Sequence, residues 1–259
     1  MVNSSPKRFF PVRLAGAHTV ALVAAVTACL ADPSHKAVHQ LRKETRRVEA
    51  LLILLADLPD ISKHDLHTKR LHRCLRKLRR AAGEVRDLDV HQERLNEIAE
   101  GGTAPESAGK AREGEKLVKA ARFLNKRLLR QRRDAGKDLQ EELRKRQRPT
   151  AVATEAWLAS LAPEKGVSLT AKALLERVEA KVHDGLLAES LTRDLTGDEL
   201  HTLRKTAKAA RYLAEMLPAS TAATAAARRF ESLQESGGRW HDALELAALR
   251  NVSWEGGMP

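Results

Sequence analysis

The sequence predicts an all-α protein made of two antiparallel helical-bundle repeats related by approximate two-fold symmetry. The 259 residues are 31% charged and only 3% aromatic, a composition that favours helices. No segment alternates apolar and polar residues over enough positions to predict a strand. The pattern H-x-L-R-K occurs at His39 and again at His201, 162 positions later (201 − 39), which indicates an internal duplication.

The first part of the chain predicts two helices, over residues 16–30 and 35–57. Between them Asp32-Pro33-Ser34 has the character of a turn and an N-cap. Apolar residues of the second helix recur on one side, and its basic residues lie about 150° away around the axis. The apolar seam is Val38, Leu41, Thr45, Val48, Leu52 and Leu55, and the basic column is His39, Arg42, Lys43, Arg46 and Arg47.

A third helix is expected to begin near Asp65 and to weaken at Gly83, with Asp87 opening a short helix over residues 88–99 as its N-cap. Its apolar seam opposes a second basic column. After a loop at residues 101–109, a long helical stretch over residues 111–146 is expected, interrupted at Gly136. Pro149 predicts a break before another helix at residues 154–161. The seam is Leu71, Leu75, Leu78, Ala82 and Val85; the column is Lys69, Arg73, Arg76 and Arg80; the long stretch carries Arg122, Lys126, Arg127, Arg130 and Arg133.

Residues 163–166 are the predicted linker. The first repeat then occupies residues 1–165, including the long helical insertion, and the second occupies residues 166–259, the two forming one domain. The second repeat is expected to hold four helices, at residues 170–191, about 200–217, 222–235 and 240–249. The second of these repeats both faces of the His39 helix, with His201, Arg204, Lys205 and Lys208 at the basic positions.

The formal net charge is +12 and the isoelectric point is near 10.0, which indicates an anionic partner. Nucleic acid, an anionic membrane and a phosphate polymer all fit this charge. Guanidinium and ammonium groups placed side by side on rigid helices form an array that one small phosphate cannot neutralise, so an extended polyanion is favoured. A nearby polyanion would also favour the protonated form of His39 and His201.

The N-terminal part of the chain leaves two interpretations open. Lys7, Arg8 and Arg13 precede an apolar run over residues 14–31, which fits either the first helix of the bundle or an export signal with a lipoprotein-like cleavage site at Cys29. Polar residues interrupt the run, so we expect a helix of the bundle and no membrane anchor. Two cysteines give no disulfide framework, consistent with a cytoplasmic protein.

Two motifs together resemble the CHAD family, the conserved histidine α-helical domain. They are His39-x-Leu41-Arg42-Lys43-x-x-Arg46-Arg47 and Gly83-x-x-Arg86-Asp87-Leu88-Asp89-Val90. The second repeat matches in part, because Ala209 replaces the second arginine and His241-Asp242 replaces Arg-Asp. The resemblance covers essentially the whole chain. It implies binding of inorganic polyphosphate in a basic central channel between the repeats and association with polyphosphate granules.

By this resemblance and by helical position, seventeen residues are expected to bind polyphosphate. The set is His39, Arg42, Lys43, Arg46, Arg47, Arg73, Arg76, Lys77, Arg80, Arg122, Lys126, Arg130, His201, Arg204, Lys205, Lys208 and Arg211.

The sequence predicts neither catalysis nor a cofactor. His35-x-x-x-His39 has the helical spacing of metal ligands, but no third ligand is evident, so no metal is expected. There are no recognisable paired carboxylates, P-loop or nucleophile elbow. Nucleic acid is the main alternative partner, although sparse aromatic residues disfavour stacking on single strands. A scaffold that holds acidic proteins is the other alternative.

Overall fold

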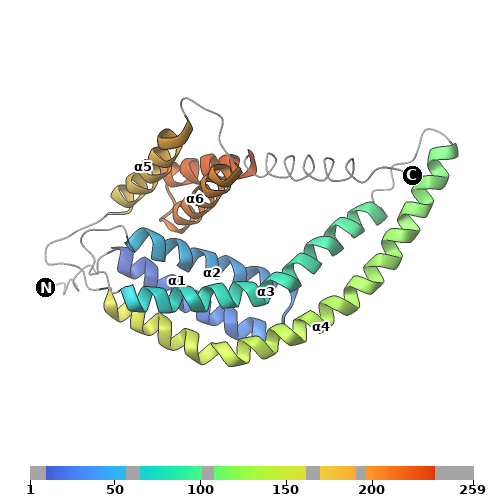
Figure 1. Cartoon of the computed structure of the whole chain (residues 1–259), viewed down its shortest axis with the longest axis horizontal. Helices are drawn as coiled ribbons and strands as arrows, with labels where there is room; N and C mark the ends of the chain where they lie inside the picture. Colours follow the sequence, from blue (N-terminus) through green and yellow to red (C-terminus); the bar gives the residue numbers. More distant parts are fainter. Residues whose placement is uncertain (1–9, 57–64, 101–107, 162–169, 191–196, 237–259) are drawn as a thin grey trace, which may run out of the picture. The chain divides into compact units, whose positions relative to one another are not determined.

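The computed structural model describes residues 10–56, 65–100, 108–161, 170–190 and 197–236. Within these ranges the chain is helical and contains no strand, which confirms the all-α prediction (Figure 1). The approximate two-fold relation between the repeats stays a prediction. The helices are α1 (Phe10–Ala31), α2 (His35–Ala56), α3 (Asp65–Glu100), α4 (Ala108–Ser160), α5 (Ala171–Ser190) and α6 (Gly197–Met216), followed by a helix over residues 221–236.

The chain forms two compact units. The α3–α4 unit consists of residues 17–45 and 64–160, and the α5–α6 unit consists of residues 1–16, 46–63 and 161–259. Helices α1 and α2 each pass from one unit to the other, α1 after residue 16 and α2 after residue 45. The predicted repeat boundaries, 1–165 and 166–259, stay a prediction.

The predicted apolar seams of α2 and α3 are buried. No residue of the α2 seam is more than 3% exposed, and every residue of the α3 seam is 0% exposed. A fully buried leucine contributes about 1.5–3 kcal/mol of transfer free energy, so these seams fix the rotation of both helices about their axes. The basic columns must then lie on the opposite sides of the helices.

The turn between α1 and α2 has the predicted cap. Ser34 Oγ accepts a hydrogen bond from the Ala37 amide at 3.4 Å, and the Ser34 carbonyl accepts one from the Val38 amide at 2.9 Å. The Asp32 amide donates to the Ala28 carbonyl at 3.0 Å, which closes the last turn of α1.

Helix α1 is packed on one side by a stripe spaced at three and four residues. Its members, Ala15, Thr19, Leu22, Val26 and Cys29, are at most 3% exposed. Residues Pro11–Ala31 are also long and apolar enough to cross a membrane, a property shared by buried core helices and N-terminal signal sequences. The cytoplasmic location therefore stays a prediction, as does the alternative export signal.

The predicted break in α3 is wrong. Helix α3 runs through Gly83 and Asp87 without interruption, and Asp87 is an exposed residue inside the helix instead of an N-cap. The apolar seam continues through Val85, which is 0% exposed, so packing on both sides of Gly83 offsets the roughly 1 kcal/mol that glycine costs inside a helix. The carboxylate with a structural role is that of Asp89, two residues further on.

The predicted breaks in α4 are also wrong. One helix of 53 residues contains Gly136 and Pro149 and joins the two helices expected at residues 111–146 and 154–161. Leu143 and Trp157, on either side of Pro149, are at most 1% exposed. Their packing holds the helix together although proline removes one backbone donor. Figure 1 shows that α4 is curved along its length.

At Gly136 the α1–α2 turn approaches α4 closely. A Cβ atom at this position would lie 3.4 Å from Pro33 Cγ and 3.3 Å from Arg132 Nη1. The Gln140 side chain donates to the Leu30 carbonyl at 2.8 Å nearby. These contacts attach the turn to the middle of α4.

Polar pairs fix the antiparallel register of α3 and α4. Arg132 Nε lies 2.9 Å from Asp89 Oδ1, and Asn125 Nδ2 lies 2.6 Å from Asn96 Oδ1. The two pairs are seven residues apart on each helix, 89 to 96 and 125 to 132, so the helices stay in step across two turns. Arg132 Nη2 also donates to the Pro33 carbonyl at 2.5 Å. This one side chain therefore joins α3, α4 and the α1–α2 turn.

Three predicted features lie outside the described residues. They are the linker at residues 163–166, the helix at residues 240–249 and most of the loop at residues 101–109.

Replacement of Arg132 by Met is expected to lower the free energy of unfolding by about 3 kcal/mol, because the Asp89 carboxylate would remain buried without its cation. The Asp89 side chain is 2% exposed. Urea denaturation followed by circular dichroism measures the change. Arg133→Met, at the next and exposed position, is the control and should change the unfolding free energy by less than about 0.5 kcal/mol. Equal effects of the two substitutions would show that the buried pair does not stabilise the fold.

Candidate anion-binding surfaces

The basic residues of α2 lie opposite its buried seam, as predicted. His39 is exposed, whereas the other four are half-buried and are partly held by the protein itself. The buried Glu44 lies between them in sequence but not in space, because it faces inward and accepts hydrogen bonds from Gln40 Nε2 at 2.9 Å and, for the donor tautomer, from His18 Nδ1 at 3.0 Å. Glu44 therefore does not offset the charge of the outer cations.

Around His39 the α3–α4 unit assembles a group of charged and titratable side chains, which we call the histidine cluster: His35, His39, Lys43, Arg86 and Glu93. His35 Nε2 lies 2.8 Å from Glu93 Oε1 and 2.5 Å from Arg86 Nη1, and Arg86 Nη1 lies 3.6 Å from the same Glu93 oxygen. The pKa of His39 is lowered from its ordinary value by partial loss of hydration and then by the positive charges of Arg86 and Lys43, with a further lowering from His35 and an opposing rise from Glu93. At neutral pH His39 is therefore mainly uncharged in the empty protein.

Arg42 is bound to the neighbouring helix. Its Nη1 donates to the Arg79 carbonyl at 3.3 Å and lies 3.5 Å from where a Cβ on Gly83 would be. The Arg42 guanidinium thus lies against α3 at Gly83. Gly83 does not end the helix. Arg42 remains half-buried and presents part of its charge outward.

All four residues of the α3 column are exposed. Its residues fall within a sector of about 60° opposite the buried seam. Arg73 Nε donates to the Lys69 carbonyl at 3.4 Å. No ion pair joins Arg76, Lys77 or Arg80 to a carboxylate elsewhere in the described part of the chain. The exposed members of the predicted set on this face are Arg73, Arg76, Lys77 and Arg80.

The predicted residues on α4 lie beside a different part of α3. Arg122, Lys126 and Arg130 are exposed. The register fixed by Asn96–Asn125 places them alongside residues 91–99, which begin about 16 Å beyond Arg80 along the helix axis. The structure therefore does not bring the α4 residues together with the α3 column.

In the α5–α6 unit, two predicted binding residues meet at one carboxylate. Arg47 Nη2 lies 3.8 Å from Glu215 Oε2, and Arg211 Nε lies 3.3 Å from Glu215 Oε1. Arg211 also donates to Glu231 at 2.9 Å. The arginine side chains are 16% and 18% exposed, so both are largely enclosed and partly neutralised. Sequence reasoning missed Glu215, although its i,i+4 spacing from Arg211 is a local signal; its pairing with Arg47 has none, because the two are distant along the chain.

The remaining predicted residues of this unit differ in their environment. Arg46 donates to Glu49 at 3.2 Å. Lys205 is exposed at the edge of an apolar cavity of about 130 Å³, whereas Arg204 and Lys208 are half-buried. His201 belongs to α6, but its side chain lies outside what the structure describes.

A metal site and a reactive thiol would each make specific requirements of the side chains in the described helices. Their His, Cys, Asp and Glu side chains form no group of three or more that could hold a metal ion. Burial and the nearby Asp32 raise the pKa of the Cys29 thiol to about 11 against an opposing effect of Arg132, so the thiolate is scarce at neutral pH.

The described helices and their exposed cations define an all-α protein with basic helical surfaces. A family model described as the CHAD domain matches residues 13–251, and the chain belongs to this family. Searches of curated proteins and of solved structures find no match.

The charges around His39 predict opposite effects of two substitutions. Arg86→Met should raise the pKa of His39, because it removes a repelling positive charge, and Glu93→Gln should lower it, because it removes a stabilising negative charge. Titration of the imidazole resonances by NMR measures both shifts, with His39→Gln used to assign the signal. A pKa of His39 that neither substitution changes would contradict the described cluster.

Proposed function

We propose that this CHAD-family chain binds inorganic polyphosphate without transforming it, and that this binding targets it to polyphosphate granules. The observation that carries the proposal is the exposed cationic face of α3 in the same unit as the histidine cluster. Arg76, Lys77 and Arg80 have no carboxylate partner among the described residues, so their charges are available to an external anion. Membership of the family supports polyphosphate as that anion.

A polymeric anion suits this face better than a single phosphate does. Four exposed cations, Arg73, Arg76, Lys77 and Arg80, recur over about 10 Å along the helix and repel one another in the empty protein. A chain of linked phosphates relieves this repulsion at several positions at once and releases several counterions from the polymer. Arginine contributes paired donors, and lysine contributes a mobile charge.

The seventeen expected residues do not contribute equally in this proposal. The α3 column and the outward side of the histidine cluster bind directly. Arg47 and Arg211 mainly hold Glu215, and their loss should affect the fold of the α5–α6 unit as well as binding. The prediction that both repeats contribute to one central channel stays a prediction.

The triple substitution Arg76→Ala, Lys77→Ala and Arg80→Ala should weaken binding of long-chain polyphosphate at least about tenfold, because several phosphate contacts are lost together. The slope of affinity against salt concentration should also become shallower. Isothermal titration calorimetry at two salt concentrations measures both quantities, and circular dichroism checks the fold.

The matched control removes three exposed cations of α4, with Lys137→Ala, Arg144→Ala and Arg148→Ala. It has the same net charge as the test variant and should bind within about threefold of the parent chain, since only long-range attraction is reduced. Equal losses in the two variants would mean that net charge alone determines binding. Retention of duplex DNA or RNA against excess polyphosphate would favour the nucleic-acid alternative.

Binding of polyphosphate should also be coupled to protonation of His39. Its pKa is lowered in the empty protein, and a bound polyanion favours the imidazolium, so affinity should rise as pH falls from 7.5 to 6. Calorimetry at pH 6.5 in two buffers of different ionisation enthalpy gives the number of protons taken up. His39→Gln should reduce that number. Proton release, or uptake that His39→Gln leaves unchanged, would contradict the placement of phosphate beside this residue.

A further inference from the structure

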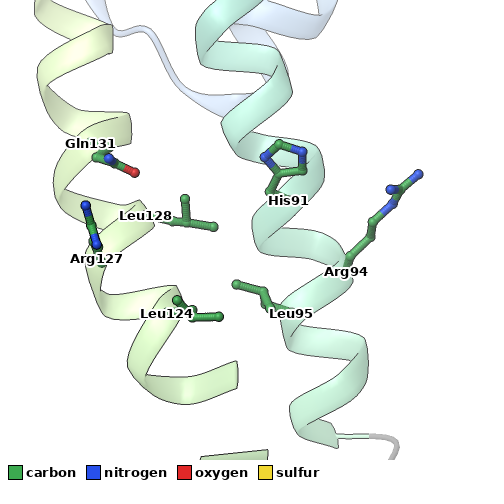
Figure 2. Close-up of a pocket in the computed structure, with 7 residues that line it drawn as sticks. All are labelled: His91, Arg94, Leu95, Leu124, Arg127, Leu128 and Gln131. Carbon is green, nitrogen blue, oxygen red and sulfur yellow. The ribbon is translucent and has the colours of Figure 1, made fainter. Parts of the chain in front are cut away.

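An apolar groove lies between α3 and α4 near the end of the hairpin that they form. It has a volume of about 420 Å³. Figure 2 shows Leu95 on α3 and Leu124 and Leu128 on α4 in the space between the two helices. Basic and titratable side chains stand at its edge: His91, Arg94 and Arg127.

The apolar surface extends beyond the groove itself. Leu124 is 46% exposed, and Leu117, two turns earlier on the same side of α4, is 58% exposed. On α3, Ile98 lies one turn beyond Leu95 and is 39% exposed. Neighbouring exposed leucine and isoleucine side chains are typical of a surface that a partner covers.

This surface is separate from the proposed polyphosphate site. Glu93, a member of the histidine cluster, precedes Leu95 by two residues and therefore projects about 160° away from it around α3. The Pro33 turn contacts α4 through Gly136 and Arg132, beyond the groove. A ligand in the groove would leave the cluster accessible.

We propose that the groove binds an acidic amphipathic helix of a partner protein. Two antiparallel helices with leucines between them form a groove in which the apolar side of a third helix can pack. The charge of the rim selects the partner, because the residues that line the groove include His91, Arg94 and Arg127 and no Asp or Glu. Glutamates flanking the apolar stripe of the partner would pair with Arg94 and Arg127.

Charge and shape favour this occupant over two others. A second copy of the chain would bring the same basic rim against this one and would be repelled. A membrane surface requires apolar side chains on one side of a helix. Here Phe123, 71% exposed, and Leu129, 53% exposed, project about 100° to either side of their neighbours Leu124 and Leu128.

The test uses the full chain and a fluorescent synthetic helix of 14 residues, with leucines at positions i, i+3, i+7 and i+10 and glutamates beside them. A scrambled peptide of identical composition is the peptide control. Fluorescence anisotropy should show at least about tenfold tighter binding of the amphipathic peptide, because only its leucines lie on one side. Equal binding of the two peptides would reduce the effect to non-specific charge attraction and overturn the proposal.

Matched variants locate the binding site. Leu124→Glu should weaken binding of the amphipathic peptide at least about tenfold, whereas Leu129→Glu, at an equally exposed leucine outside the groove, should leave it within about threefold. Leu124→Gln, which adds no charge, should act in the same direction as Leu124→Glu. Arg127→Glu should weaken binding more than Arg133→Glu, although both change the net charge equally. Circular dichroism verifies that each variant is folded.

Three further results would also overturn the proposal. One is equal effects of Leu124→Glu and Leu129→Glu. Another is absence of peptide binding together with binding to phosphatidylserine vesicles that Leu124→Glu abolishes, which would assign the groove to a membrane. The third is absence of peptide binding together with self-association in sedimentation that Leu124→Glu abolishes, which would assign the groove to a second copy.

Discussion

Burial of one side of α2 is the constraint on which the rest of this structure depends. The seam from Val38 to Leu55 is removed from water, so α2 cannot rotate to hide its basic residues. The opposite side must therefore carry His39, Lys43 and their neighbours outward. Helix α3 obeys the same rule, with a fully buried seam and an outer column of cations. A strongly basic sequence becomes a set of oriented basic faces for this reason.

Internal partners then divide these cations by availability. Glu93 joins His35 and Arg86, and Glu215 joins Arg47 and Arg211, so part of the positive charge is already opposed by the protein. Arg42 is directed onto a backbone carbonyl. On α3, Arg76, Lys77 and Arg80 have no carboxylate partner among the described residues. A polyanion would meet preorganised cations on α3. At the groups around Glu93 and Glu215 it would have to compete with these carboxylates for the cations.

Local periodicity was sufficient to predict much of the fold. The seams of α2 and α3 and the Ser34 cap follow from residue spacing and capping chemistry, and the structure has them where expected. Gly83, Gly136 and Pro149 misled the prediction of helix ends, because glycine and proline act locally whereas Val85, Leu143 and Trp157 stabilise the helices through tertiary packing. At Gly83 the side chain of Arg42, a residue 41 positions earlier (83 − 42), lies against α3.

The sequence predicted which cations belong to the candidate site, but it did not predict the acidic side chains that pair with them. Spacing identifies which side of a helix a residue occupies, so Arg76, Lys77 and Arg80 could be found. Partners from distant parts of the chain, such as Glu93 for His35 and Asp89 for Arg132, leave no local signal. Their identification required the helices to be placed against one another.

The most direct test of the central claim is the acetylation rate of individual lysines, measured by mass spectrometry with and without long-chain polyphosphate. If the anion lies along α2 and α3 of the α3–α4 unit, Lys43 and Lys77 should be protected. Lys137 and Lys172, which are 70% and 87% exposed, should react at unchanged rates. Equal protection of all four lysines, or protection of Lys137 and Lys172 alone, would contradict the account.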